Sequence, residues 1–253
     1  MKQADNVLRT VIVEDELLSR LYLSSLLDNF CPEVEVVAKA ESEQAAIEAI
    51  TRLQPDLVLL DIELRSGSGF EVLRKLEHTG ACIIFITALD HYAINAIRIC
   101  GMDYLQKPVE NESLQAAVRS AAQNRDNDRS RASLACLLEA LENGGVPRRL
   151  LLPDEKGESV LINEIVRIES ADKGSIFLLE NGSSRADASS LSHWEQLLRD
   201  LHFFRIHPLH LVNIAKVAGV ESDKLQLNMC DGSIVPASPK RIAELARRMK
   251  EIR

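Results

Sequence analysis

Three acidic side chains stand at the ends of two short apolar segments. Glu14 and Asp15 follow residues 8–13, and Asp61 follows residues 56–60. Both segments have the composition of buried strands, and in a doubly wound parallel sheet the carboxyl ends of neighbouring strands share one crevice. Three carboxylates there repel one another, by about 4 kcal/mol for each pair roughly 4 Å apart at an effective dielectric constant near 20. A hard divalent cation offsets this repulsion, so we predict a Mg²⁺ site at these carboxylates.

Two further side chains complete a site for phosphoryl chemistry. Thr87 ends the apolar segment 82–87, and Lys107 follows a short strand and precedes Pro108. A Lys-Pro bond after a strand is a natural place for a tight turn, either cis or trans. The ammonium would neutralise phosphoryl oxygens and the hydroxyl would donate to one of them. Asp61 is then the candidate nucleophile, because a carboxylate can accept a phosphoryl group as an acyl phosphate.

The elements that position these residues alternate between strand and helix patterns. Ser42 is placed to cap a helix that runs to Arg52, and Pro55 prevents that helix from continuing. Strands are expected at 8–13, 34–40, 56–60, 82–87 and 104–106, and helices at 17–27, 42–52, 69–76, 91–99 and 112–123. This alternation predicts an α/β fold: a doubly wound, five-stranded parallel sheet of flavodoxin-like order 2-1-3-4-5, covered by helices on both faces.

Four segments carry a specific resemblance. VIVEDE, DLVLLDIE, FITALD and GMDYLQKPV, in this order and spacing, resemble a two-component receiver domain over residues 7–123. The resemblance implies that Asp61 is the phosphoacceptor. It also implies that Glu14, Asp15 and Asp61 bind Mg²⁺ together with the backbone carbonyl of Glu63. Glu14 replaces a commoner aspartate and keeps its charge.

The same resemblance implies a conformational switch. Thr87 and Lys107 match the family's Thr/Ser and Lys, and Tyr104 matches its switch aromatic. In the family, the hydroxyl moves toward the phosphoryl group and the aromatic ring turns inward, which alters a face through which dimerisation is common. Where the family usually has proline four residues after the phosphoacceptor, this chain has Arg65. We therefore expect a more flexible loop and a changed dephosphorylation rate.

After Pro147 the pattern becomes β-rich, with helices expected at 192–201 and 240–252. Asn181-Gly182 and Asp231-Gly232 lie between apolar runs and are strong hairpin signals. The segments VRIESADKGSIFL, FFRIHPLHLVNI and LQLNMCDGSIVPASPKRIAEL resemble a LytTR domain over residues 148–251. The resemblance implies a mostly β fold that binds repeated DNA half-sites as two protomers.

Several polar side chains in this half are candidate DNA contacts. They are Lys173, Ser175, Arg205, His207, Lys240 and Arg241. Their groups suit phosphates or base edges. Pro208 and Pro239 stand where many members of the family have polar or basic side chains. A structural interpretation also stays open: Arg205 could pair with an acid such as Glu169, and His207 and Asn213 could satisfy buried backbone groups.

Residues 124–147 differ from both halves. A charged stretch precedes leucines at helical spacing, and Gly144-Gly145 and Pro147 follow. We interpret this segment as a linker with a short amphipathic helix, between domains at 1–123 and 148–253. The helix either extends the preceding one and pairs with another protomer or lies on its own domain.

Composition limits the class of protein. Of 253 residues, 46% are hydrophobic and 27% charged, and neither a bilayer-spanning run nor a signal peptide is evident, so we expect a soluble cytoplasmic protein. Residues 1–146 carry 14 Lys and Arg against 23 Asp and Glu, a net −9, which suits a cation site; the remainder is +1, weak support for nucleic-acid binding. Five cysteines without a Cys-x-x-Cys pair are expected to be reduced and mostly buried: Cys31, Cys82, Cys100, Cys136 and Cys230.

These observations predict a response regulator. A sensor histidine kinase would phosphorylate Asp61, the receiver would dimerise, and the homodimer would bind promoter DNA to regulate transcription. Beyond self-catalysed phosphorylation and dephosphorylation we expect no enzyme activity. Alternatively, the LytTR-like domain no longer binds specific DNA and the chain regulates protein partners. A metabolic α/β enzyme is the weaker rival, because no Gly-rich phosphate loop follows the first strand.

Overall fold

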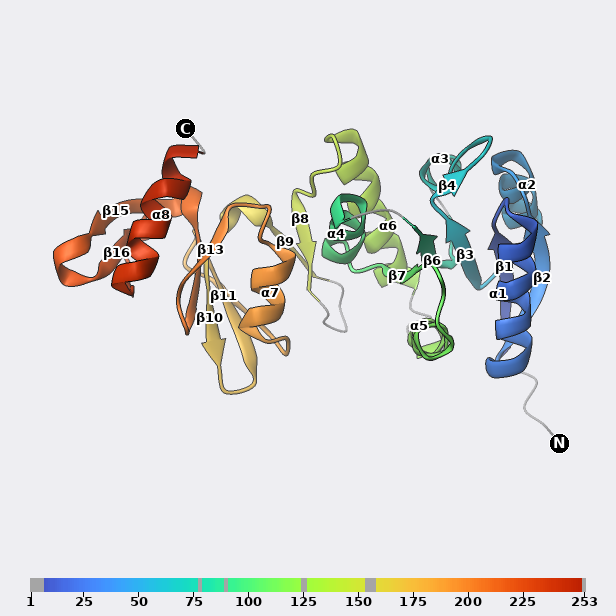
Figure 1. Ribbon diagram of the computed structural model, residues 1–253, viewed down its shortest axis with the longest axis horizontal. Coiled ribbons are helices and arrows are strands. Elements are labelled where there is room, and N and C mark those ends of the chain that lie inside the picture. Colours follow the sequence, from blue (N-terminus) through green and yellow to red (C-terminus); the bar gives the residue numbers. More distant parts are fainter. Residues whose placement is uncertain (1–6, 77–78, 89–90, 124–126, 153–157, 252–253) are drawn as a thin grey trace. The chain divides into compact units, whose positions relative to one another are not determined.

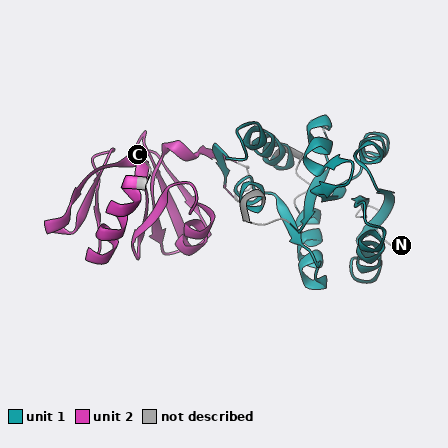
Figure 2. Ribbon diagram, turned by 45° about the horizontal axis from the view of Figure 1, so that its top comes forward, with its two compact units in different colours: residues 1–151, 155–157 teal, residues 152–154, 158–253 magenta. Residues whose placement is uncertain are grey.

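The computed structural model describes residues 7–76, 79–88, 91–123, 127–152 and 158–251. They form two compact units, the first ending at Leu151 and the second continuing from there (Figure 2). The sequence places this boundary after residue 147, with a linker before it. Residues 124–126 of that linker and Ile252, the expected end of the last helix, lie outside the described residues.

The first unit is built on a five-stranded parallel sheet (Figure 1). Its order is β2-β1-β3-β6-β7, which confirms the predicted order 2-1-3-4-5. The strands are β1 (Leu8–Val13), β2 (Val34–Ala40), β3 (Leu57–Asp61), β6 (Cys82–Thr87) and β7 (Asp103–Gln106). Every residue of β3 is buried, because this strand lies at the centre of the sheet and is covered on both faces.

Helices cover both faces of the sheet, as predicted. They are α1 (Leu17–Phe30), α2 (Glu43–Leu53), α3 (Gly69–Lys75), α4 (His91–Ile99) and α5 (Asn111–Gln123). Apolar residues of α1 and α5 share one core with alternate strand residues such as Ile12 and Leu59, and α2, α3 and α4 share the other core with Val11 and Val58. Ser42 caps α2 as predicted, its hydroxyl accepting the N–H of Ala45 at 3.3 Å.

A sixth helix, α6 (Asn127–Glu142), belongs to the first unit. It packs against α3 and α4, and its Leu134 and Leu137 join the apolar core of that face, as does Leu151 of β8 (Arg149–Leu151). The segment expected to be a linker therefore lies on its own domain, one of the two arrangements that the leucine spacing allows. β8 was not predicted from the sequence.

The cysteine prediction is wrong for one pair. The structure joins Cys100, directly after α4, to Cys136 of α6 in a disulfide with a Cα–Cα distance of 5.5 Å. Cys31, Cys82 and Cys230 are free. The two partners are 36 positions apart in the sequence and meet only because α6 packs back onto α4, so their spacing carried no signal.

The second unit is mostly β, as predicted. It holds a five-stranded antiparallel sheet of order β12-β11-β10-β14-β13 and a three-stranded sheet β15-β16-β17. Its strands are β9 (Ser159–Leu161), β10 (Ile165–Ala171), β11 (Gly174–Leu179), β12 (Ser184–Asp187), β13 (Phe203–His207), β14 (His210–Asn213), β15 (Val217–Glu221), β16 (Gln226–Met229) and β17 (Ile234–Pro236). Asn181-Gly182 and Asp231-Gly232 connect β11 to β12 and β16 to β17, as the hairpin signals predict, with Gly182 and Gly232 at φ of 78° and 80°.

Two helices complete the second unit. α7 (Leu191–Leu197) buries Trp194, whose ring meets that of Phe177 edge-on at 5.0 Å. α8 (Pro239–Glu251) packs against β13 and contributes Ile242 and Leu245 to the core. Short 3-10 turns lie at Ile162–Glu164, Ile214–Lys216 and Ser222–Lys224. Within the described ranges, no helix combines the length and apolar character needed to cross a membrane.

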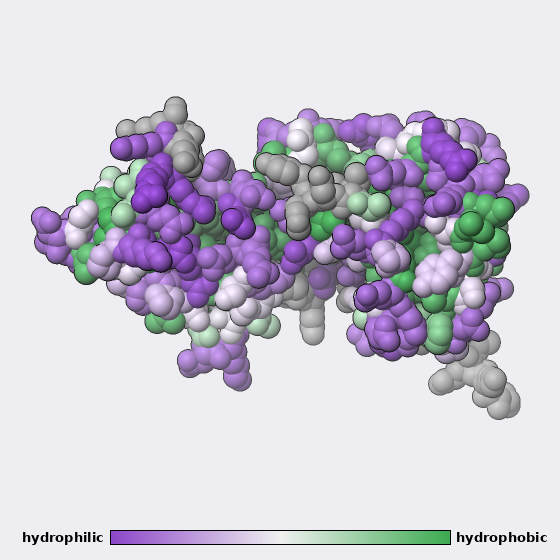
Figure 3. Space-filling view, viewed as in Figure 1, coloured by the Kyte–Doolittle hydropathy of each residue, from purple (hydrophilic) through white to green (hydrophobic). Residues whose placement is uncertain are grey.

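The outer side of α1 carries an exposed apolar patch (Figure 3). Leu17, Leu18, Leu21 and Tyr22 are all at least half exposed, and Leu18 reaches 74%. This patch supplies a matched control for the buried leucines of α6.

Leu137→Ala should lower the free energy of unfolding of the first unit by about 2–5 kcal/mol, because it removes a fully buried side chain from the core. Leu18→Ala should change it by less than about 0.5 kcal/mol. Hydrogen exchange of the β3 and β6 amides in urea, followed by mass spectrometry, reports this unit alone. Equally small effects of the two substitutions would show that α6 contributes nothing to its stability.

Candidate functional site

Three carboxylates converge at the carboxyl ends of β1 and β3. One oxygen from each of Glu14, Asp15 and Asp61 can be chosen so that all three lie within 4.8 Å of one another. Glu14 and Asp61 are buried, and the Asp15 side chain is 12% exposed. β1 and β3 are neighbours at the point where the strand order reverses, so two distant parts of the sequence meet in one crevice.

Lys107 lies between two of these carboxylates. Its Nζ is 2.6 Å from Asp61 Oδ2 and 2.8 Å from Glu14 Oε2. Burial raises the pKa of Glu14, while the Lys107 ammonium opposes that rise. Burial alone would lower the pKa of Lys107, but its contacts with Asp61 and Glu14 hold that pKa above the ordinary value. Lys107 is therefore a cation fixed by two acids.

The strand register brings Thr87 to the same edge. Asp61 is opposite Ile86 in the β3–β6 pair, so Thr87 is the next residue along, and it is fully buried. The Lys107 N–H donates to the Thr87 carbonyl at 2.9 Å, and the Lys107–Pro108 peptide bond is cis, one of the two forms expected. Tyr104 of β7 is half-buried and packs against the core formed with α4.

The carboxylate cluster fits a divalent cation. All of its donors are hard oxygens, and Glu14 Oε2 is buried without a directed hydrogen bond although Lys107 Nζ is near. The other Glu14 oxygen accepts the N–H of Glu16, and one Asp61 oxygen accepts the N–H of Glu63. These bonds fix the carboxylates while leaving oxygens directed at the crevice, as a Mg²⁺ site requires.

The loop after Asp61 contains a small antiparallel hairpin that the sequence does not indicate. It is formed by β4 (Glu63–Leu64) and β5 (Gly67–Ser68), and the flexibility expected of this loop stays a prediction. Within it, the Arg65 N–H donates to Asp15 Oδ2 at 2.8 Å and the Arg65 Nε lies 3.4 Å from the same oxygen. At Gly69, which begins α3, a Cβ would collide with the Asp61 carbonyl.

Arg20 is a positioning residue that the sequence did not reveal. It is buried on α1, and its guanidinium donates to the Glu14 carbonyl and pairs with Glu41 at 3.2 Å. Arg20 thereby holds the backbone at the end of β1. The sequence feature that could have indicated this role is the position of Arg20, six residues after Glu14 and near the start of a leucine-rich helix.

In the second unit, two of the candidate DNA contacts are exposed lysines. Lys173 lies in the β10–β11 turn and Lys240 in the first turn of α8. The register pairs Glu169 with His210 and His210 with His207, so the β10–β11 and β13–β14 turns share one end of the sheet. Lys173 and His207 therefore lie at the same end of the sheet.

Ser175 is not available for DNA. It is 1% exposed, and its hydroxyl donates to the Ser189 carbonyl at 2.8 Å. The prediction that Ser175 contacts DNA conflicts with this placement. Side chains alternate along β11, and Ser175 lies on the same buried face as Phe177 and Leu179.

Arg205 and His207 organise the β13–β14 turn. The Arg205 guanidinium donates to the carbonyls of His207 and Pro208 and pairs with Glu195 at 3.4 Å. The His207 Nδ1 accepts the N–H of Leu209. Arg205 thus pairs with an acid, as the structural alternative proposed, and that acid is Glu195.

Arg241 is committed to contacts within the unit. It pairs with Glu244 at 3.1 Å and lies 5.4 Å above the Phe204 ring, which Arg248 also approaches at 5.0 Å. Pro239 occupies the first position of α8, where the missing N–H costs nothing. Asn213 is structural, as the alternative proposed: it caps the turn at Ile214 and donates to the Ile165 carbonyl at 3.0 Å.

Comparison with known proteins gives both units a family. Residues 10–119 match the response regulator receiver domain, and residues 156–250 match the LytTr DNA-binding domain.

An uncharacterized response regulatory protein of Vibrio cholerae is 33% identical over 226 residues, which cover 84% of this chain and 87% of that protein. The sensory transduction protein LytT of Bacillus subtilis is 30% identical over 250 residues, covering 95% and 98%. The signal receiver domain of a modulated diguanylate cyclase from Desulfovibrio desulfuricans is 25% identical, with a TM-score of 0.40 over 47% of this chain and 96% of that one.

Glu14→Gln should weaken Mg²⁺ binding at least about tenfold, because the amide removes a buried anionic ligand. Glu16→Gln, a change of the same kind at an exposed neighbour, should leave binding unchanged. Titration calorimetry measures both. Because burial raises the pKa of Glu14 above 4.5, wild-type affinity should fall as the pH drops through that raised pKa, at a higher pH than an exposed glutamate would show. Equal affinities for the two variants would exclude Glu14 as a ligand.

Proposed function

This chain belongs to the response regulators that join a receiver domain to a LytTR DNA-binding domain, and from that membership we propose that Asp61 accepts the phosphoryl group. As a two-component response regulator, it regulates transcription. One observation carries the proposal: the Lys107 ammonium contacts both Asp61 and Glu14 at a sheet edge that also holds Asp15. Such a site suits a reaction limited by charge neutralisation.

Each side chain has a distinct part in that reaction. Asp61 Oδ attacks the phosphorus of the kinase's phosphohistidine; the O–P bond of the acyl phosphate forms as the P–N bond breaks, and the histidine leaves as the imidazole. Lys107 neutralises the phosphoryl oxygens and Thr87 donates a hydrogen bond to one of them. Glu14, Asp15 and Asp61, with the Glu63 carbonyl, would hold Mg²⁺, which supplies further neutralisation of the phosphoryl charge. No separate catalytic base is required, because Asp61 is already a carboxylate.

Phosphorylation would be transmitted through β6 and β7. Thr87 would move toward the phosphoryl group and Tyr104 would turn toward the space it leaves. Both residues border the core that α4 shares with the sheet, so their movement would alter the α4 side of the unit. A sensor histidine kinase is the proposed phosphodonor, and a homodimer the proposed active form.

For the output domain we propose binding of promoter DNA through the sheet end that bears Lys173 and through the start of α8, where Lys240 is exposed. Arg205 and His207 would act by shaping the β13–β14 turn, and Arg241 by its contact with Phe204. A second candidate function, regulation of a protein partner, is favoured by Pro208, which is exposed in the turn and offers no side-chain donor.

Asp61→Asn should abolish acid- and base-labile phosphorylation by acetyl phosphate with Mg²⁺, because the amide is not a nucleophile. Asp56→Asn is the matched control: it changes the same residue type at the opposite end of β3, where Asp56 accepts the Arg9 N–H at 2.8 Å. Gel shift on a phosphate-binding matrix measures the product. Lys107→Ala should lower the rate of Asp61 phosphorylation or impair the conformational switch that follows it. Retained labelling in Asp61→Asn would move the site elsewhere.

Lys173→Ala combined with Lys240→Ala should weaken DNA binding and reduce the slope of log affinity against log salt by about 1.8, since each phosphate contact contributes about 0.9. Lys224→Ala, which removes an exposed lysine that pairs with Glu221, should change neither quantity. The DNA would come from genome-wide selection of bound fragments, with and without phosphodonor. Failure to enrich any motif, with phosphorylation intact, would favour the protein-partner function.

A further inference from the structure

The Cys100–Cys136 disulfide lies within the seam between α4 and α6. Cys100 is fully buried and Cys136 is 4% exposed. Around them, Leu134 and Leu137 of α6 pack into the core of the sheet, and a Cβ added at Gly101 would lie within 4 Å of the side chains of Ser133 and Leu151. Neither sulfur can be reached by a thiol while α6 is docked.

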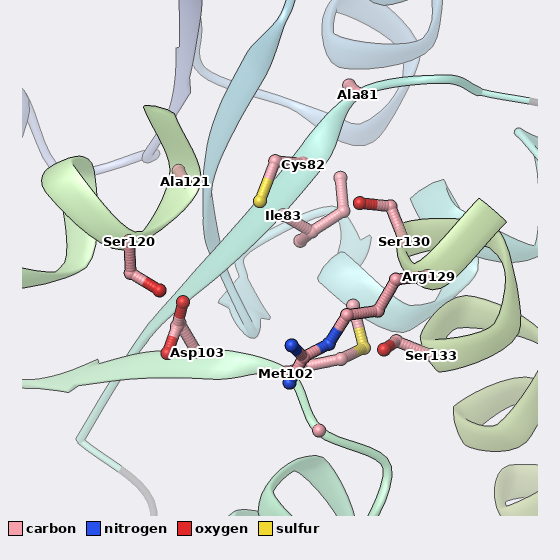
Figure 4. Close-up of a pocket in the computed structure, with 11 residues that line it drawn as sticks. Ala81, Cys82, Ile83, Met102, Asp103, Ser120, Ala121, Arg129, Ser130 and Ser133 are labelled. Atoms are coloured by element: carbon pink, nitrogen blue, oxygen red, sulfur yellow. The ribbon is translucent and has the colours of Figure 1, made fainter. Parts of the chain in front are cut away.

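A polar cavity lies beside this seam, next to Gly101 and Ser133. It has a volume of about 80 Å³ and lies between the first half of α6 and the amino ends of β6 and β7. Figure 4 shows the Arg129 guanidinium reaching from α6 toward the side of Asp103, with Ser133 of α6 beside it. Asp103 is hydrogen-bonded to Ser120, and burial raises its pKa. This half of α6 therefore rests on polar groups around a void, an arrangement from which local opening is expected.

The disulfide also closes a loop of the chain that contains the residues proposed to respond to phosphorylation. The closed loop from Cys100 to Cys136 contains β7 with Tyr104, Lys107, and all of α5. It ties the end of α4 to the last helix before the second unit. Phosphorylation would alter the α4 side through Thr87 and Tyr104, so a covalent bond at this place restrains the element that must respond.

We propose that Cys100–Cys136 is a redox modification site: a dithiol reductant of the thioredoxin class opens it, and its reduction releases α6 from α4. A thiolate of the reductant attacks one sulfur of the disulfide and forms a mixed disulfide, and the released cysteine leaves as a thiolate that takes up a proton. The second thiol of the reductant then resolves the mixed disulfide. Two electrons pass to the chain, which gains two thiols, and the reductant leaves as a disulfide.

The reductant can reach the sulfurs only after α6 has moved away from α4. Because both sulfurs are buried, attack requires α6 to lift, and after reduction only non-covalent contacts return it to α4. A promoter-binding protein works where thiols are kept reduced, and disulfides in such compartments are commonly redox-sensing. The disulfide and its burial come from the structure; the compartment in which it would be reduced and its effect on the response at Asp61 rest on the proposed function.

The site is tested first on the full chain isolated without reductant and treated with oxidised glutathione. Alkylation after denaturation should label three of its five cysteines, and all five after thioredoxin and its reductase. Hydrogen exchange of the α6 amides should be at least about tenfold faster in the reduced protein. Cys136→Ser should match the reduced wild type, and Cys230→Ser, which removes an exposed free cysteine, should not. Five free thiols after oxidation, or equal α6 exchange in the two states, would overturn the proposal.

The coupling is tested by DNA affinity with and without acetyl phosphate, in both redox states of the wild type. The ratio of the two affinities should be at least about fivefold larger in the reduced protein. An equal ratio would refute the coupling. In Asp61→Asn the redox effect on α6 exchange should persist without a phosphorylation response. A wild-type protein that shows the redox effect but no phosphorylation response would contradict the function proposed for Asp61 and not the redox site. Chemical reduction of the wild type keeps the test valid if Cys136→Ser does not fold.

Discussion

The contact of the Lys107 ammonium with two buried carboxylates determines which strand ends of the first unit must lie together. Asp61 and Glu14 are held together with little exposure, and each close carboxylate pair would cost about 4 kcal/mol at roughly 4 Å without compensation. Lys107 supplies one compensating charge from the end of β7. A bound cation would supply more. The unit must therefore bring the ends of β1, β3 and β7 into one crevice, and the order of the parallel sheet does so.

This requirement explains which parts of the site were readable from the sequence. Glu14, Asp61 and Thr87 each follow or end a strand that is largely apolar, because the strand is covered on both faces, and Lys107 follows the short edge strand β7. Strand ends are local features, and a doubly wound topology places them together without further information. The loop after Asp61 was less readable. Its Ser-Gly-Ser-Gly composition gave no sign of the local pairing of Glu63 with Ser68, and the contact of Arg65 with Asp15 depends on a partner 50 residues away.

Long-range packing also explains what the sequence could not supply elsewhere. The leucines of α6 allowed two arrangements because an amphipathic helix needs an apolar partner but does not specify which. Ser175 has the type of side chain that contacts DNA, yet the pleat of β11 directs it inward to Ser189. Arg205 could pair with several acids, and the turn at Pro208 selects Glu195 together with two backbone carbonyls. In each case the residue type was informative and its direction was set by tertiary structure.

The two units use their charges differently, and this bears on how one can control the other. In the first unit, Lys107 and Arg65 are fixed by acids at the carboxyl edge of the sheet, so a new anion at Asp61 must rearrange existing ion pairs. In the second, Arg205 donates to backbone carbonyls of its own turn and Arg241 lies over the Phe204 ring, whereas Lys173 and Lys240 are exposed. A signal that begins with ion pairs at β1, β3 and β7 can leave the first unit only through packed elements. α4 and α6 pack on the same face of the sheet, and the Cys100–Cys136 bond joins the end of α4 to α6 beside a polar cavity.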